Sequence, residues 1–321
     1  MARYSVVIPC YKSSKTIEKV VALTVKEFGR LGFNDYEFVL VNDCSPDNGA
    51  TINVLYRMAR KWPFIKVVNL GKNAGQHNAT MAGLQYATGD YIISMDDDMQ
   101  THPSQIIRLK EKMDEGFDIV YGYYPEKKES FFRRMGSALN HFTVRMLIHK
   151  PKWLKTSSYW MIRKYVRDYA ITYTHPSVHL QGVFLRITDN IACVPIDHFK
   201  REVGTSTYTL KKLIKLYSNI IGFSMTPMRI VTSTGCVFSL IGFITGLIMF
   251  IRKLIYPAIL EGWTSLIGAM CFFSGVILIS LGVVGSYVGR LFVGQTKSPQ
   301  YVVRDLTNIC EDKNEIGVKE L

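Results

Sequence analysis

The stretch Tyr91–Gln100, with the sequence YIISMDDDMQ, joins an apolar run to three consecutive carboxylates. The run Tyr91–Met95 is rich in β-forming residues and follows the turn signal Thr88-Gly89-Asp90, so we predict a buried strand there. Carboxylates at the carboxyl end of a strand in an α/β sheet lie where ligands bind. We therefore expect the ligand-binding edge of the fold at this point.

The spacing of the carboxylates predicts a metal site. Side chains of an extended chain alternate between two faces, so Asp96 and Asp98 can point the same way while Asp97 points away. Two carboxylates directed at one point repel each other unless a cation lies between them. Oxygen ligands of this kind favour Mg²⁺ or Mn²⁺, usually shared with substrate phosphates, and Gln100 offers a further carbonyl oxygen. A solvated acidic turn is the competing interpretation of the stretch taken alone.

Apolar runs and helical apolar patterns alternate on both sides of this stretch. The predicted strands are Tyr4–Pro9, Tyr36–Val41, Ile65–Leu70, Tyr91–Asp96, Phe117–Tyr121 and Ile191–Ile196. The predicted helices are Thr16–Leu31, Thr51–Arg60, Gln76–Ala87 and Ser104–Glu115. Such an alternation predicts an α/β fold with a doubly wound, mainly parallel sheet. Right-handed crossovers would place the strand ends Asp43, Asn69 and Asp96 along one edge.

The last third of the chain contains two uncharged stretches, 230–251 and 263–289. Each is longer than the roughly 20 residues that cross a bilayer, so we predict a two-helix membrane hairpin over 230–289. Buried core helices are the competing interpretation. The hairpin would follow a cytoplasmic domain at 1–207 and a juxtamembrane helix at 208–229, and a tail at 290–321 would end the chain.

Charge predicts the orientation of this hairpin. Only Arg252 and Lys253 lie in its connecting loop, whereas Lys and Arg residues gather at its outer ends. Positive residues stay on the cytoplasmic side, so both termini are expected there. Ala2–Tyr11 is predicted to be a strand, without the basic region and cleavage site of a signal peptide. The six cysteines show no CxxC spacing, which favours reduced thiols in a cytosolic domain.

The net charge of +13 has a local source between Lys127 and Arg167, where Glu129 is the one acidic residue. Within this segment, Phe131–Ile148 has large apolar residues among arginines, which predicts a helix lying in the membrane interface. Attraction to anionic lipid or to a lipid phosphate fits a membrane hairpin. Nucleic-acid binding and a solvated basic face are the competing interpretations. Neither a GxGxxG fingerprint nor a P-loop occurs.

Six motifs carry a family resemblance: SVVIPCY (5–11), VNDCSPDN (41–48), GKNAGQHNATMAG (71–83), MDDDMQ (95–100), FKREVGTSTY (199–208) and GSYVGRLF (285–292). Their order and spacing resemble those of family 2 glycosyltransferases, and more narrowly those of bacterial polyprenyl-phosphate glycosyltransferases. The resemblance implies a GT-A fold in a bacterial inner-membrane enzyme. It also implies transfer of a sugar from a nucleotide-diphosphate donor, with a UDP-sugar favoured, to polyprenyl phosphate, for a cell-envelope glycan or lipopolysaccharide.

The resemblance also implies roles for individual residues. The donor contacts would be Pro9, Tyr11, Asp43, Gln76, Asp96 and Asp97. The metal ligands would be Asp96, Asp98 and Gln100. The acceptor phosphate would lie against Arg133, Arg201, Ser206 and Tyr208. Asp96, Asp98 and Arg201 would be the catalytic residues.

A phosphate monoester is largely a dianion at neutral pH, so the acceptor needs orientation by arginines more than it needs a general base. For some residues a structural role competes: an Asx turn at Asp43, packing or capping at His77, and helix-surface charge at Arg134 and Arg163. The sequence departs from the family pattern at Asn42, Asp97 and Thr207, which leaves donor choice and acceptor geometry open.

Other classes of protein compete with this interpretation. One is a non-catalytic membrane scaffold that binds nucleotide sugars beside a flippase, and another is a processive polysaccharide synthase. The pair Asp96 and Asp98 argues against the scaffold. The absence of a QxxRW segment argues against the synthase. A flippase partner and a homo-oligomer are expected from the resemblance, and no nucleic-acid partner is expected.

Overall fold

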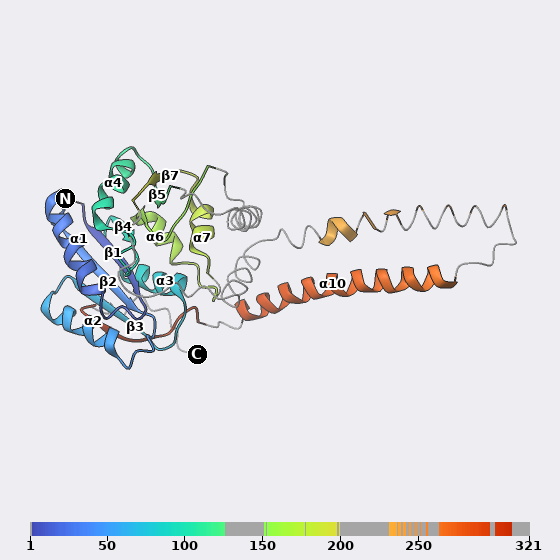
Figure 1. Ribbon diagram of the computed structural model, residues 1–321, viewed down its shortest axis with the longest axis horizontal. Helices are drawn as coiled ribbons and strands as arrows, with labels where there is room; N and C mark the ends of the chain where they lie inside the picture. The colour runs from blue at the N-terminus through green and yellow to red at the C-terminus, as the bar shows by residue number, and fades with distance from the viewer. Residues whose placement is uncertain are drawn as a thin grey trace. The chain divides into compact units, whose positions relative to one another are not determined.

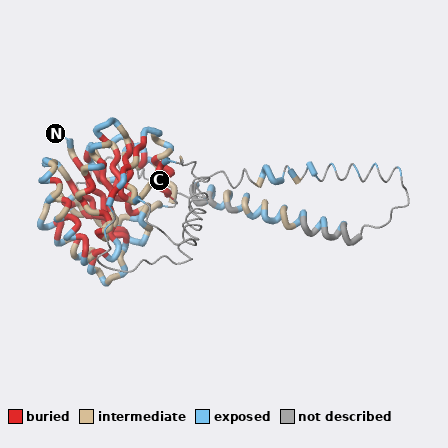
Figure 2. The backbone as a smooth tube through the Cα atoms, turned by 45° about the horizontal axis from the view of Figure 1, so that its top comes forward, coloured by how far each residue is buried: buried red, intermediate tan, exposed pale blue. Residues whose placement is uncertain are grey.

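The structure is a computed structural model that describes residues 2–125, 151, 153–176, 178–197, 199, 231–235, 237, 238, 240, 241, 244, 248, 251, 255, 263–295 and 299–309. The chain divides into two compact units (Figures 1 and 2). The first unit holds the described residues up to 199 together with 299–309. The second unit holds those between 231 and 295.

The described part of the first unit contains one eight-stranded sheet in the order β7-β5-β6-β4-β1-β2-β3-β8. Its strands are β1 Tyr4–Cys10, β2 Tyr36–Asn42, β3 Ile65–Leu70, β4 Tyr91–Ser94, β5 Ile119–Tyr123, β6 Trp160–Arg163, β7 Ile191–Pro195 and β8 Val303–Thr307. β1 pairs in parallel with β2 and β4, and β2 with β3. β6 and β8 are antiparallel to their neighbours. The predicted α/β fold is confirmed, with a mixed sheet.

Helices cover both faces of the sheet (Figure 1). They are α1 Ile17–Leu31, α2 Ala50–Lys61, α3 Gln76–Tyr86, the short 3₁₀ helix η1 Pro103–Gln105, α4 Ile106–Asp114, α6 Lys164–Ala170 and α7 Leu180–Ile187. α1, α2 and α4 bury their apolar side chains with Val6, Ile8 and Leu40 on one face. On the other face, a Cβ at Gly83 of α3 would lie 2.4 Å from Val7 Cγ1. Glycine therefore lets α3 lie directly against the sheet.

Two strands, β6 and β8, were not predicted from the sequence. β6 is four residues long and leads directly into α6, so no turn signal marks its end. β8 lies in the region where only a tail is expected. Its pattern, VRDLT, is too polar to be recognised as a strand, and it forms as an edge strand on β3. Edge strands tolerate charged residues because one side of the strand faces away from the sheet.

Much of the predicted membrane region lies outside the described residues. This holds for the interfacial helix at 131–148, the juxtamembrane helix at 208–229 and much of the first uncharged stretch. The second stretch lies in α10, Trp263–Gln295. α10 exposes many large apolar side chains, among them Leu266, Met270, Ile277, Leu278, Ile279, Leu281, Leu291 and Phe292. Counting only the described residues, no helix is both long enough and apolar enough to cross a membrane.

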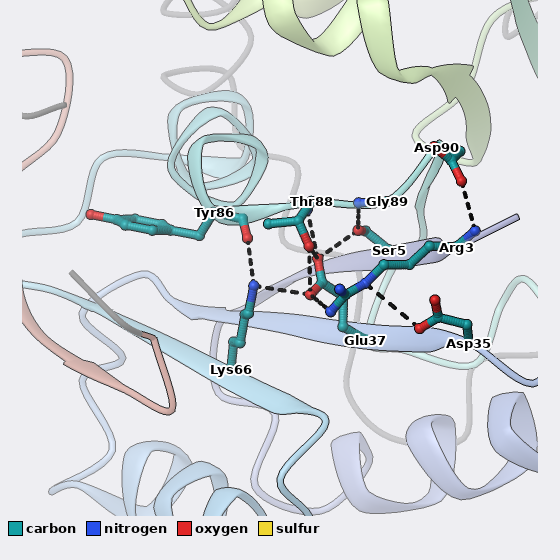
Figure 3. Close-up of polar contacts among 9 residues, drawn as sticks. All are labelled: Arg3, Ser5, Asp35, Glu37, Lys66, Tyr86, Thr88, Gly89 and Asp90. Atoms are coloured by element: carbon teal, nitrogen blue, oxygen red, sulfur yellow. Dashed lines mark hydrogen bonds and ion pairs between the residues drawn. The ribbon is translucent and has the colours of Figure 1, made fainter. Parts of the chain in front are cut away.

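A buried carboxylate, Glu37, holds together the amino ends of β1, β2 and β3 (Figure 3). Glu37 accepts hydrogen bonds from Ser5 Oγ at 2.7 Å and from the Thr88 backbone N–H at 2.6 Å. Lys66 Nζ and Arg3 Nη2 each lie 2.9 Å from Glu37 Oε2. Burial by itself would raise the pKa of Glu37, but these partners outweigh burial, and the pKa lies below its ordinary value of 4.5.

We predict that Glu37→Gln lowers the free energy of unfolding by about 3 kcal/mol, because Lys66 loses its charged partner and the carboxylate no longer accepts every donor. Arg3 is 44 % exposed and adds little to this figure. A depressed pKa stabilises the fold above the unfolded value near 4.5 and loses that effect as the pH falls through the folded pKa. Urea denaturation between pH 3 and pH 7 should therefore show a weaker acid dependence in the variant.

Glu18→Gln is the matched control, because Glu18 forms an exposed ion pair with Arg57. It should change the unfolding free energy by less than about 0.5 kcal/mol. Equal effects of the two substitutions would contradict a special role for Glu37.

Candidate active site

The carboxyl ends of β1, β2, β3 and β4 lie on the same side of the sheet, because β1 pairs in parallel with β2 and β4, and β2 pairs in parallel with β3. The loops that follow these strands contain non-glycine residues with positive φ: Lys12 at 61°, Cys44 at 46°, Asn48 at 52° and Met99 at 63°. Such a conformation costs roughly 1–3 kcal/mol and persists where surrounding contacts impose it. The loops at this edge are therefore held in defined conformations.

Asp43 fixes the loop before α3. Its carboxylate is buried and accepts hydrogen bonds from the backbone N–H groups of Ala74 at 2.6 Å and Gly75 at 2.9 Å. Asn73 Nδ2 donates to the same carboxylate at 2.9 Å. A negative charge here also complements the positive end of the α3 dipole. Asp43 thus has a structural role, which is to hold the loop before α3 and not to form a local Asx turn. Its predicted contact with the nucleoside stays a prediction.

Asp96 lies just after β4 and is held from two sides. Gln76 Nε2, at the start of α3, donates to Asp96 Oδ1 at 2.7 Å. Ser158 Oγ, from the loop before β6, donates to Asp96 Oδ2. Donors of this kind orient carboxylates that bind metals. Gln76 lies beside Asp96, and its predicted contact with the donor stays a prediction.

The carboxylates of Asp97 and Asp98 have different hydrogen-bond partners. Asp97 accepts hydrogen bonds from the Tyr11 backbone N–H at 3.3 Å and from Ser13 Oγ, so its carboxylate faces the loop after β1. Burial raises the pKa of Asp97, and the charge of Asp98 raises it further, whereas its hydrogen bonds lower it. Asp98 Oδ1 accepts the Gln100 backbone N–H at 3.0 Å. This turn and the positive φ of Met99 bend the chain after Asp98.

Tyr124, which is half-buried, feels the charges of both Asp96 and Asp98. Burial raises the pKa of Tyr124, its hydrogen bond with Thr101 lowers it, and the charges of Asp96 and Asp98 raise it. Carboxylates are ligands that suit a divalent metal such as Mg²⁺ or Mn²⁺, which proteins often hold with one or two carboxylates and substrate phosphates. Within the described residues, no group of three or more His, Cys, Asp and Glu side chains could hold a metal ion.

The structure also describes the predicted residues Pro9, Tyr11, Gln100 and His77. Pro9 is the penultimate residue of β1, and Tyr11 is 47 % exposed in the loop that follows. The side chain of Gln100 has no described role, whereas the backbone carbonyl of Gln100 accepts a hydrogen bond from the Phe199 N–H at 3.0 Å. His77 packs against His179 with ring centroids 5.3 Å apart, and burial lowers its pKa. A neutral packing role for His77 is therefore the one that these contacts support.

Arg163 was expected to be either a helix-surface charge or a site residue, and both expectations are wrong. It ends β6 opposite Tyr91, at the other edge of the sheet. Its guanidinium donates to the carbonyls of Phe117 at 3.0 Å and Met113 at 2.9 Å. The remaining predicted residues, Arg133, Arg134, Arg201, Ser206, Thr207 and Tyr208, lie outside the described residues, as do Lys127 and Lys128.

Ser158, Ser13 and Asn73 contact the site carboxylates and were not predicted as site residues. Ser158 reaches Asp96 only because β6 inserts between β4 and β5. No sequence signal predicts that insertion. Asn73 lies inside the motif GKNAGQHNATMAG, so it could have been proposed from its position in the loop before α3.

In doubly wound α/β sheets, ligands bind at the carboxyl ends of the strands, where Asp43 and Asp96 lie in this chain. Residues 5–169, about half of the chain, match the profile of the family described as Glycosyl transferase family 2. The chain belongs to this family and is a glycosyltransferase.

Solved structures share the fold. Glucosyl-3-phosphoglycerate synthase from Mycobacterium tuberculosis, in complex with Mn²⁺, UDP-glucose and phosphoglyceric acid, is 18% identical, with a TM-score of 0.51 over 69% of this chain and 78% of that chain. The same enzyme with Mn²⁺, UDP and phosphoglyceric acid is 18% identical, with a TM-score of 0.50 over 69% and 77%. At this identity the likeness establishes the GT-A type of α/β fold alone.

We predict that Asp43→Asn destabilises the loop before α3 by about 1–3 kcal/mol, because one amide N–H₂ would face donors that now bind a carboxylate oxygen. The change should be measured by thermal denaturation together with hydrogen exchange at Ala74 and Gly75. Asp47→Asn is the matched control. The Thr51 N–H donates to Asp47 Oδ2, while the buried Oδ1 has no hydrogen-bond partner in the described structure. An amide nitrogen in the place of Oδ1 would therefore face no hydrogen-bond donor. Equal exchange at Ala74 and Gly75 in the two variants would contradict the prediction.

Proposed function

We propose that this glycosyltransferase moves a sugar from a UDP-sugar to a polyprenyl phosphate, such as undecaprenyl phosphate, in a reaction that depends on Mg²⁺ or Mn²⁺. The observation that carries the proposal is the placement of Asp96 and Asp98 directly after β4. They lie at the edge where Asp43 fixes the start of α3, in a chain that belongs to Glycosyl transferase family 2.

The donor would lie along this edge. Gln76 and Ser158 hold Asp96 in place for the diphosphate region. The choice of UDP draws support from the glycosyltransferase of the same fold that was crystallised with UDP or UDP-glucose and Mn²⁺.

Asp96 and Asp98 would hold the metal ion, with Gln100 as a further ligand. The metal, when bound, neutralises the charge that builds up on the departing diphosphate. The acceptor phosphate would attack the anomeric carbon with one of its oxygens, and the bond from that carbon to the nucleoside diphosphate would break. In-line attack inverts the anomeric centre. Arg133, Arg201, Ser206 and Tyr208 would orient the acceptor, as arginines do in bidentate phosphate contacts.

The choice of a lipid acceptor rests on the second unit and on the basic segment between residues 127 and 167. α10 exposes large apolar side chains along its length, including Leu278 at 69% and Ile279 at 70%. Such a surface is favourable in lipid and costly in water. We propose an enzyme of the bacterial inner membrane with its catalytic unit and both termini in the cytoplasm, and with lysines and arginines near the lipid phosphates.

We predict that the purified protein, incubated with undecaprenyl phosphate, Mn²⁺ and labelled UDP-, GDP- and dTDP-sugars, transfers label from a UDP-sugar to the organic phase. Asp98→Ala should lower the rate at least about 100-fold, because it removes one of two carboxylates that hold the metal. Chelation by EDTA should stop transfer, and added Mn²⁺ should restore it.

Asp35→Ala is the control for this assay, because Asp35 is an exposed carboxylate at the opposite edge of the sheet. It should leave the rate unchanged. Hydrolysis of a UDP-sugar without a lipid product would contradict the acceptor and keep the donor. Transfer that survives Asp98→Ala and EDTA would contradict the metal site.

The full chain should remain in the membrane pellet after alkaline carbonate extraction, because the apolar surface of α10 binds lipid independently of charge. Quantitative release into the supernatant would contradict a membrane-embedded hairpin. A peripheral control protein bound by charge alone should be released under the same conditions.

A further inference from the structure

The segment 299–309 follows α10 in the sequence and packs against the catalytic sheet. β8 pairs with β3 from Val67–Thr307 to Leu70–Val303. Asn308 Nδ2 donates to the carbonyls of Ala59 at 2.7 Å and Ile65 at 2.9 Å. The Gly71 N–H donates to Val302 O at 2.8 Å, so the segment also reaches the loop before α3.

A continuous chain of hydrogen bonds leads from β8 to the candidate site. Asn69 Nδ2 donates to Asp305 Oδ2 at 2.7 Å, and Asn42 Nδ2 donates to Asn69 Oδ1 at 2.8 Å. Ser45 Oγ donates to Asn42 Oδ1 at 2.8 Å, and the Lys12 N–H donates to Ser45 Oγ at 3.1 Å. Asn42 and Asn69 are both buried. The chain ends beside Lys12 and Cys44, two of the residues with positive φ.

Every bond in this chain donates toward Asp305. A carboxylate only accepts, so Asn69 must turn its N–H₂ toward Asp305 and its carbonyl toward Asn42. Asn42 must then turn its own N–H₂ toward Asn69, which leaves its carbonyl for Ser45. The Tyr56 hydroxyl also donates to Asp305 and accepts from Asn69 Nδ2 at 3.3 Å, so Asp305 sets the orientation of both buried amides directly and through Tyr56. Hydrogen bonds aligned head to tail also strengthen one another.

We propose that Asp305 is a positioning residue for the donor site: through Asn69 and Asn42 it fixes the loops 11–13 and 43–48 against which the nucleotide binds. The assignment of a nucleotide to these loops rests on the proposed function. The amide at Asn42 is then explained by its partners. An amide can donate to Asn69 and accept from Ser45, whereas a carboxylate could not donate to Asn69.

Hydrogen exchange on the full chain tests the positioning role without any ligand. In Asp305→Ala, the amides of Lys12 and Ser45 should exchange about tenfold faster or more, because their acceptors lose a fixed orientation. Strands β5 and β7 should exchange as in the wild type. Asp305→Asn should give an intermediate result, because an amide at this position no longer dictates the orientation of Asn69.

Asn308→Gly is the matched control. It removes two hydrogen bonds that anchor β8, keeps a residue suited to φ of 59°, and leaves Asp305 unchanged. Its faster exchange should be confined to residues near Ala59, Ile65 and β8. Unchanged exchange at Lys12 and Ser45 in Asp305→Ala would overturn the proposal. A uniform increase that includes β5 and β7 would also overturn it, since that result describes global destabilisation.

Binding of UDP with Mn²⁺ then tests the link to the donor. Asp305→Ala should weaken the affinity about tenfold, and Asn308→Gly should leave it unchanged. Faster loop exchange with unaltered UDP affinity would overturn the assignment of these loops to the nucleotide. A wild-type protein that binds no UDP would contradict the proposed donor, while the exchange experiment would still decide the positioning role of Asp305.

Discussion

The loops at the carboxyl ends of the parallel strands depend on carboxylates that accept hydrogen bonds. Asp43 holds the loop before α3, Asp97 holds the loop after β1, and Asp305 orients the amides between β2 and β3. A parallel sheet leaves the chain to turn away from each strand with backbone N–H groups that need acceptors. Carboxylates supply those acceptors, and the same edge gains the negative charge that a metal site requires.

Charged side chains have different roles at the amino ends and at the carboxyl ends of the strands. At the amino ends, Glu37 is buried and surrounded by cationic and neutral donors, so its charge is balanced inside the protein. At the carboxyl ends, Asp96 and Asp98 are partly exposed, and the contacts shown for them come from neutral donors. The first arrangement stabilises the fold. The second suits the metal ion that we propose for this site.

The predicted strands and helices before residue 124 closely match the structure, because each of them has a clear apolar period and a turn signal at its ends. β6 and β8 were missed for the same physical reason: each gains its stability from pairing with distant strands rather than from its own pattern. The misassignment of Arg163 follows from the missed β6. Ser158 was missed because its contact with Asp96 depends on where β6 lies in the sheet.

The sequence by itself determined the alternation of strands and helices, and with it the edge at which Asp43 and Asp96 lie, because apolar periodicity and crossover handedness are properties of the local chain. The motifs determined the family. Only the tertiary structure decided which carboxylates face the site and which hold loops, because hydrogen-bond partners such as Gln76, Ser158 and Ala74 come from separate elements. It also decided that residues 303–307 complete the sheet, since an edge strand of mixed polarity forms only when a neighbouring strand offers its backbone.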